Sequence, residues 1–212
     1  LIYNSPSFDL GGMTASFDVE YSPEASGTSP NDGGVQESTE FNDGRSLGVT
    51  LAGGGLTVGV YGAETDNDGP TARDVDAFEG VWYANYSMGP VSIGYSASYH
   101  DSGQYVTAEA ATAAKVVNTA GGLFETEMFS IAFNVNDNLS VSYGKATDTY
   151  DNQSNNSSGT ETLDVEMELK SIQLSYTMGS MSINAQRTET DNPKYDSAGG
   201  SLTKTEVALG LA

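Results

Sequence analysis

The stretch from Val81 to His100 constrains the fold of this chain most, because its polarity alternates on both sides of the tight turn Met88-Gly89-Pro90. The large apolar residues share one face and are Phe78, Trp82, Ala84 and Tyr86 before the turn and Val91, Ile93, Tyr95, Ala97 and Tyr99 after it. The opposite face of the second half is small or polar and consists of Ser92, Gly94, Ser96, Ser98 and His100. A period of two on each side of a tight turn predicts a β-hairpin.

The two faces of this hairpin need different surroundings, one apolar and the other aqueous. Later hairpins repeat the design, and the sequence supplies neither a helix nor a second sheet to cover their apolar faces. No apolar run approaches the roughly 18 to 20 residues of a membrane helix. The pattern therefore predicts an all-β, transmembrane antiparallel β-barrel with a wet lumen. A soluble β-sandwich or solenoid is the alternative.

Alternation along the whole chain predicts eleven strands in a single domain, residues 1–212. They span residues 1–8, 13–21, 45–52, 56–63, 78–87, 91–100, 123–135, 139–148, 162–178, 181–189 and 201–212. Short turns alternate with long loops near 22–44, 64–77, 101–122, 149–161 and 190–200. This alternation is typical of a barrel with tight turns at its periplasmic rim and long loops outside.

Two segments leave questions that the strand pattern does not answer. In the strand at 162–178 the apolar residues change from odd to even positions, which indicates either a bulge near Lys170-Ser171 or an outer part above the membrane. The second interpretation is favoured, because roughly 9 to 11 tilted residues already cross a bilayer. In the loop at 101–122, the sequence from Ala108 to Val117 predicts a short helix at the barrel mouth.

Small polar residues dominate the inward rows of the predicted strands, which leaves volume unfilled and predicts a channel. The predicted pore-lining residues are Asp18, Glu20, Asn85, Ser96, Ser98, His100, Lys204 and Glu206. Aromatic residues of the outward rows are expected to form girdles at the two membrane interfaces, in bands about 25 Å apart. Tyr21 and Tyr99 are assigned to the outer girdle, and Phe8, Tyr86 and Tyr176 to the periplasmic one.

Charge and composition exclude several classes of function. Twenty-nine acidic residues against eight basic ones give a formal net charge of −21, which argues against nucleic acid as a partner. The chain has no cysteine, so it has no disulfide, thiol nucleophile or thiolate metal site. Its one histidine, His100, has no catalytic spacing around it. We therefore predict that the protein is not an enzyme and has no cofactor, apart from structural calcium in its loops.

The calcium hypothesis concerns one acidic loop. Glu64, Asp66 and Asp68 occupy positions one, three and five of a calcium-loop pattern. The match then fails at Val75, where the pattern requires a bidentate glutamate. A solvated acidic loop is the alternative.

Strand direction adds an expectation about the chain's extent. The first and last predicted strands both run toward the periplasmic rim, so they would meet parallel and could not close a barrel by the usual antiparallel pairing. In a sixteen-stranded barrel the first of these eleven strands would be the sixth. We therefore expect further N-terminal strands before Leu1.

Short motifs resemble the general diffusion porins of Gram-negative outer membranes, most closely those of marine alphaproteobacteria. Tyr3-Asn4-Ser5-Pro6-Ser7-Phe8, followed by Gly11-Gly12-Met13 and a run ending in Tyr21, is similar to strand six of sixteen. The segments from Tyr176 to Ile183 and from Val207 to Ala212 resemble the last hairpin and the closing strand. The resemblance implies a homotrimer of sixteen-stranded barrels in the bacterial outer membrane, with a constriction loop before Leu1.

The leading functional hypothesis is passive diffusion of small hydrophilic solutes and ions, with weak cation selectivity from Asp18, Glu20 and Glu206. Outer-membrane lipid and lipopolysaccharide are the expected partners, and Lys145 and Arg187 are outward cations that could meet lipid phosphates. The alternative is a surface protein that acts as an adhesin or phage receptor through its acidic loops.

Overall fold

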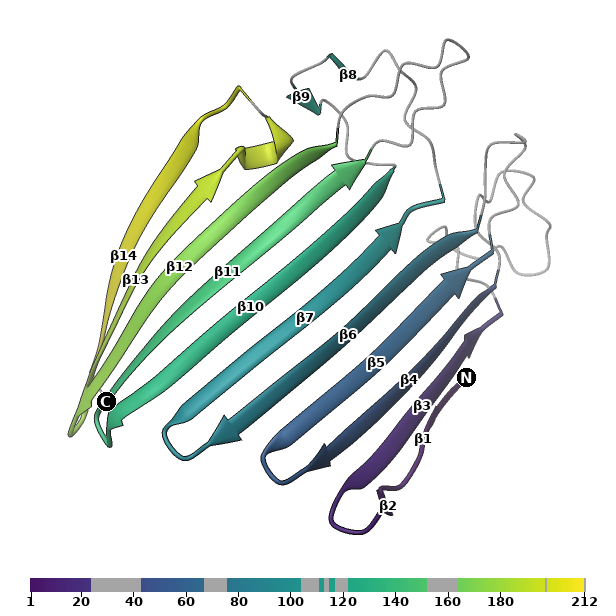
Figure 1. Ribbon diagram of the computed structural model, residues 1–212, viewed down its shortest axis with the longest axis horizontal. Helices are drawn as coiled ribbons and strands as arrows, with labels where there is room; N and C mark the ends of the chain where they lie inside the picture. Colours follow the sequence, from purple (N-terminus) through teal and green to yellow (C-terminus); the bar gives the residue numbers. More distant parts are fainter. Residues whose placement is uncertain are drawn as a thin grey trace.

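The fold is one antiparallel sheet of twelve strands, whose long strands follow one another in sequence order (Figure 1). The computed structural model describes residues 1–23, 43–66, 76–103, 111–112, 115–116, 122–151, 164–196 and 198–211. The strands of the sheet are β1 (Ile2–Asn4), β2 (Phe8–Asp9), β3 (Thr14–Ser22), β4 (Gly44–Gly53), β5 (Leu56–Thr65), β6 (Ala77–Met88), β7 (Val91–Asp101), β10 (Leu123–Asn136), β11 (Leu139–Asp151), β12 (Val165–Met178), β13 (Met181–Asp191) and β14 (Ser201–Leu211). The all-β antiparallel class is confirmed, and each predicted strand after the first is present as a continuous strand.

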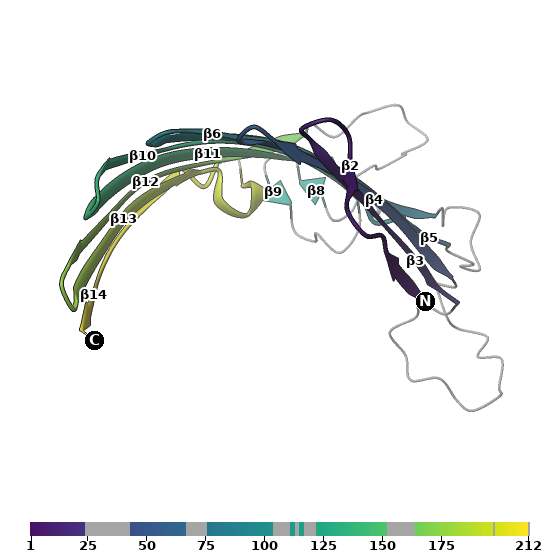
Figure 2. The same cartoon turned by 90° about the horizontal axis from the view of Figure 1, so that it is seen from below.

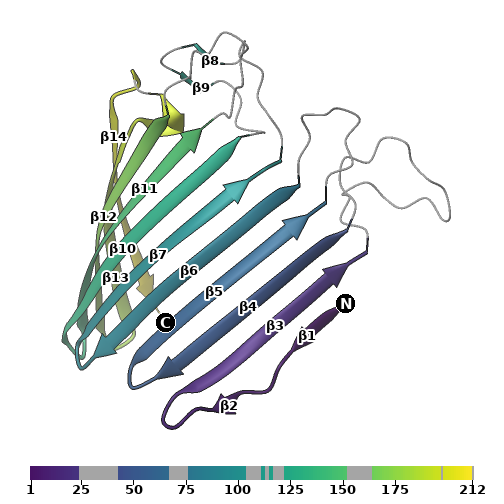
Figure 3. The same ribbon diagram turned by 45° about the vertical axis from the view of Figure 1, so that its right-hand side comes forward.

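The sheet is curved rather than flat. Seen from below it forms an arch whose two ends bend toward the same side (Figure 2). In the described part of the chain the end strands β1 and β14 do not pair with each other. The short turns lie together at one end of the long strands, and the strand ends that the short turns do not join lie at the other end (Figure 3). The predicted sidedness of the sheet is therefore present.

Glycine makes the tight turns possible. Gly54 and Gly55 have φ angles of 59° and 85°, and Gly89 and Gly179 have φ angles of 57° and 59°. Two-residue hairpin turns need positive φ to match the right-handed twist of the flanking strands, and glycine adopts it without a steric cost.

The first predicted strand, residues 1–8, is interrupted in the structure. β1 ends at Asn4 and β2 begins at Phe8, and both pair with β3. Pro6 lies between them and has no amide hydrogen to donate to a ladder, which explains the break.

Strand β12 contains no bulge. Its pairing with β11 and with β13 continues without a register shift through Lys170 and Ser171. The apolar residues Val165, Met167 and Leu169 therefore lie on the opposite face from Ile172, Leu174, Tyr176 and Met178. The bulge alternative was wrong.

The helix predicted from Ala108 to Val117 is wrong where the structure describes that segment. Ala111–Thr112 (β8) and Lys115–Val116 (β9) form a small antiparallel pair. β9 contacts the 3₁₀ turn η2 (Pro193–Tyr195), and tertiary contacts of this kind commonly override intrinsic helix propensity, even the high propensity of alanine. No helix among the described residues is long or apolar enough to cross a membrane.

The sheet has almost no packed core. Tyr150 is the only buried large apolar residue among those described, whereas Val60, Ile172 and Val207 are 56%, 61% and 71% exposed. A soluble sandwich would bury such residues against a second sheet, so the exposed apolar rows need another covering.

Candidate functional site

Cross-strand register divides the sheet into two faces. Asp18 pairs with Gly48, and the same row continues on neighbouring strands through Tyr61, Val81, Ser98, Thr126 and Asp148. We call this face the polar face and the opposite one the apolar face. The register places all the predicted pore residues on the polar face, namely Asp18, Glu20, Asn85, Ser96, Ser98, His100, Lys204 and Glu206. Their lining of a pore remains a prediction.

The polar face is the concave one. β9 lies on the concave side of the arch in Figure 2 and contacts η2. Tyr195 of η2 packs against Phe124 and Tyr150, which belong to the polar face. Polar side chains are therefore turned toward the hollow of the arch, as a water-filled lumen requires.

A hollow of about 480 Å³ on the polar face gathers several of these residues. It is lined by Asp18, Gly48, Tyr61, Glu79 and His100, among others. His100 Nδ1 lies 2.8 Å from Glu79 Oε1, across the hairpin of β6 and β7. The histidine is thus paired with a carboxylate on the wall.

An aromatic cluster lies at the loop end of the polar face and was not predicted. The ring centroids of Phe124 and Tyr150 are 4.7 Å apart, and that of Tyr195 lies 5.8 Å and 5.4 Å from them. The Tyr195 hydroxyl donates a short hydrogen bond to Asp148 Oδ2. Burial and this bond to an anionic acceptor raise the pKa of Tyr195. The cluster fixes the connection between β13 and β14 on the concave wall.

The predicted girdle residues all lie on the apolar face. Phe8, Tyr21, Tyr86, Tyr99 and Tyr176 pair there with Ala15, Arg45, Leu56, Gly80 and Leu139. Tyr21 and Tyr99 lie near the loop ends of their strands and the other three near the turns. The separation of the two bands remains a prediction.

The apolar face changes to charge toward its loop end. On β11 the change falls between Tyr143 and Lys145, and on β12 between Ile172 and Lys170. Lys145 and Lys170 both pair with Glu168, and Lys170 Nζ also lies 4.0 Å from an oxygen of Asp191. Lys145, expected to face lipid phosphate, is therefore already partnered by a carboxylate.

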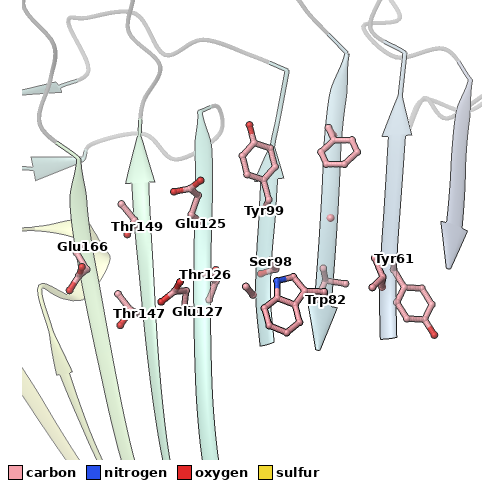
Figure 4. A pocket seen from close by; sticks show the side chains of 15 residues that line it. Tyr61, Trp82, Ser98, Tyr99, Glu125, Thr126, Glu127, Thr147, Thr149 and Glu166 are labelled. Carbon is pink, nitrogen blue, oxygen red and sulfur yellow. The ribbon is translucent and has the colours of Figure 1, made fainter. Parts of the chain in front are cut away.

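A groove of about 590 Å³ crosses the loop half of the sheet and is shown in Figure 4. Trp82 and Tyr99 line it from β6 and β7, and Glu125 and Glu127 line it from β10 (Figure 4). Register places these four side chains on the apolar face. Trp and Tyr side chains are enriched at the level where a membrane interior meets its headgroups.

Part of the predicted calcium loop gathers at the rim. Carboxylate oxygens of Glu64, Asp66 and Asp76 lie within 4.8 Å of one another, whereas Asp68 lies outside the described residues. Arg45 Nε lies 3.1 Å from Glu64, and its Nη2 lies 3.5 Å from Asp66. Arg45 therefore already contacts two of the carboxylates that a metal would need.

Asp66 also shares a hydrogen bond with the carboxyl group of Asp43. This bond raises the pKa of Asp66 and lowers that of Asp43. Calcium binding here stays a prediction. If it is right, a calorimetric titration of the protein with calcium should show saturable binding at millimolar concentration. A rim satisfied by Arg45 alone would show none.

Comparison with known structures identifies the fold. The chain resembles the anion-selective porin from Comamonas acidovorans with a TM-score of 0.61 and 13% identity, over 99% of this chain and 58% of that one. It also matches the outer-membrane expressed OmpT of Vibrio cholerae, with a TM-score of 0.47 and 14% identity, over 96% of this chain and 60% of that one. No family model and no curated protein matches the sequence. The first structural match shows a porin-barrel fold, of which this chain spans just over half the length.

Proposed function

We propose that this chain forms part of the wall of a passive diffusion channel for small hydrophilic solutes and ions in the bacterial outer membrane. The carrying observation is the two-faced sheet, in which the polar face is concave and the exposed apolar rows are convex. A closed barrel of this kind satisfies its backbone hydrogen bonds between strands while lipid covers the apolar rows. The porin fold of the Comamonas protein supports the same function.

We further propose a weak preference for cations. The polar face carries Asp18, Glu20 and Glu79 on the strands from β3 to β7, and its Lys204 lies 2.9 Å from Glu206. A wall of low dielectric constant around carboxylates concentrates cations in the lumen. The Comamonas porin is named for anion selectivity. Under this proposal the two proteins share a fold and differ in ion preference because the charges on their channel walls differ.

The test of this proposal is conductance in planar bilayers. The protein should open stepwise channels, and the reversal potential across a salt gradient should favour cations. The double substitution Asp18→Asn and Glu20→Gln removes two wall charges. It should lower the cation-to-anion permeability ratio on the order of twofold at 0.01 M salt, where the Debye length is about 30 Å. The same pair should have little effect at 1 M salt, where that length is about 3 Å.

Two results would contradict this account. Absence of stepwise conductance from the folded protein would remove the channel function. An anion-favouring or zero reversal potential at low salt would remove the cation preference alone. The alternative of an adhesin or phage receptor depends on loops that lie mostly outside the described residues.

The proposed partners are outer-membrane lipid, lipopolysaccharide and two further copies of this chain. The three copies would form a homotrimer, as expected for a porin of the marine alphaproteobacterial type. The charged loop end of the apolar face supports headgroup contact, because Glu168, Lys170 and Asp191 would be costly within hydrocarbon. Sizing of the protein in mild detergent, with and without added lipopolysaccharide, tests both partners.

A further inference from the structure

Two tyrosines of the polar face lie flat against the wall. The rings of Tyr61 on β5 and Tyr83 on β6 are nearly parallel, with an interplanar angle of 9° and centroids 6.4 Å apart. Each ring covers a glycine of the neighbouring strand. A Cβ atom on Gly48 would stand 2.2 Å from two ring carbons of Tyr61, and one on Gly59 would stand 2.4 Å from a ring carbon of Tyr83. One face of each ring therefore rests on the sheet, and the other is turned to the lumen.

The position of the Tyr61 ring is fixed at its far end as well. Its hydroxyl lies 2.5 Å from the Thr50 hydroxyl on β4, in a partly buried hydrogen bond. The ring thus spans from its own strand across Gly48 to the next position along the polar face. A platform held at both ends loses little further conformational freedom when a ligand stacks on it.

Carboxylates surround the platform, and no cation of this wall sector neutralises them. A Cβ atom on Gly48, which would meet the Tyr61 ring, would also lie 2.8 Å from Asp18 Oδ2, so this carboxylate is beside the ring. Asp18, Tyr61 and Glu79 line one hollow. The described polar-face residues of β3 to β7 include no lysine or arginine, and His100 is bound to Glu79. The face of an aromatic ring is itself the negative end of its quadrupole, so ring and carboxylate both attract positive charge.

We propose that Tyr61, Tyr83 and Asp18 form a binding subsite for organic ammonium ions on the channel wall. A quaternary ammonium group fits both parts, because its methyl groups contact the ring faces while its charge is shared between the π systems and the Asp18 carboxylate. A small inorganic cation keeps its hydration shell and gains less from the rings. The inference rests on the proposed channel function, since the hollow is reached from the lumen.

The experiment measures block of K⁺ current through the protein in planar bilayers. Choline should reduce the current saturably, and its neutral isostere 3,3-dimethyl-1-butanol should not, because only choline carries the charge. Tyr61→Leu and Tyr83→Leu should each raise the half-blocking choline concentration about threefold, as expected for a cation–π contact at a partly exposed site. Tyr61→Phe should retain the block, because it keeps the π face and loses only the hydroxyl.

Matched controls separate the platform from general damage. Gly48→Ala should weaken the block as Tyr61→Leu does, because the added methyl group displaces the ring. Gly144→Ala is its control, since a Cβ atom there meets nothing closer than 3.8 Å. Tyr143→Leu on the apolar face should leave the block unchanged. Each variant is compared at equal K⁺ single-channel conductance, which shows that its barrel is intact.

Three outcomes would overturn the inference. Equal block by choline and its neutral isostere would reduce the site to apolar contact. Saturable block by maltose, without block by choline, would assign the platform to sugars. Linear, unsaturated choline flux in a channel that conducts K⁺ normally would mean that no site exists. Absence of K⁺ steps in the unmodified protein would instead contradict the proposed channel function itself.

Discussion

Leu174→Arg is expected to lower the free energy of unfolding by about 3 kcal/mol. Leu174 lies in an apolar row of β12, between Val141 and Ala185 of the neighbouring strands, and arginine near the bilayer midplane costs about 2 to 4 kcal/mol in a membrane barrel. The measurement is urea unfolding of the protein from phospholipid vesicles.

The matched control is the adjacent residue. Gln173→Arg places the same charge on the polar face, beside Ser142 and Gln186, where water can hydrate it. It should change the free energy of unfolding by less than about 0.5 kcal/mol and reduce the cation preference of the conductance. If Gln173→Arg were the costly change and Leu174→Arg the tolerated one, the two faces would be assigned the wrong way round.

Tyr150→Ala is expected to destabilise the protein by about 3 kcal/mol. Tyr150 is only 1% exposed, and its ring packs against those of Phe124 and Tyr195. Truncation of a fully buried aromatic ring removes its transfer free energy and leaves a cavity, with typical costs of about 3 to 5 kcal/mol. The same unfolding titration measures the loss, and a cost below about 1 kcal/mol would contradict the packed cluster.

The hydrogen bond between Tyr195 and Asp148 gives this cluster a pH dependence. The pKa of Tyr195 is raised in the folded protein, so the bond contributes stability that is fully present below the ordinary tyrosine pKa of about 10. That contribution is lost as the pH rises through the folded-state value, because the bond requires the protonated phenol. Tyr195→Phe should remove this alkaline loss at a cost of about 1 kcal/mol at neutral pH.

The strands and turns could be predicted because their signals are local. Alternation fixes which residues share a face, and positive φ at residues such as Gly89 and Gly179 makes the short turns possible. Even the change of face in β12 was visible as a change from odd to even apolar positions. The structure shows that Val165, Met167 and Leu169 continue the polar-face row near the aromatic cluster, where apolar side chains are tolerated.

The contacts that give the wall its chemistry could not be predicted in the same way. Tyr195 meets Asp148 across 47 residues, and Asp76 joins Glu64 and Asp66 only because β5 pairs with β6. Tyr61 and Tyr83 were each visible in the sequence, but their flat placement depends on glycines in neighbouring strands. The number of strands in the complete barrel and the separation of the aromatic bands stay predictions.

The most direct test of the two-faced wall uses the absence of cysteine from the chain. The single substitutions Ser142→Cys and Val141→Cys place a thiol at adjacent positions of β11. The first thiol lies on the polar face and the second on the apolar face. A charged, membrane-impermeant methanethiosulfonate reagent should react with the first and reduce the channel conductance. It should leave the second unmodified, although a lipid-soluble maleimide labels it. Equal reaction of both thiols with the charged reagent, or reaction of Val141→Cys alone, would contradict a water-filled lumen bounded by this sheet.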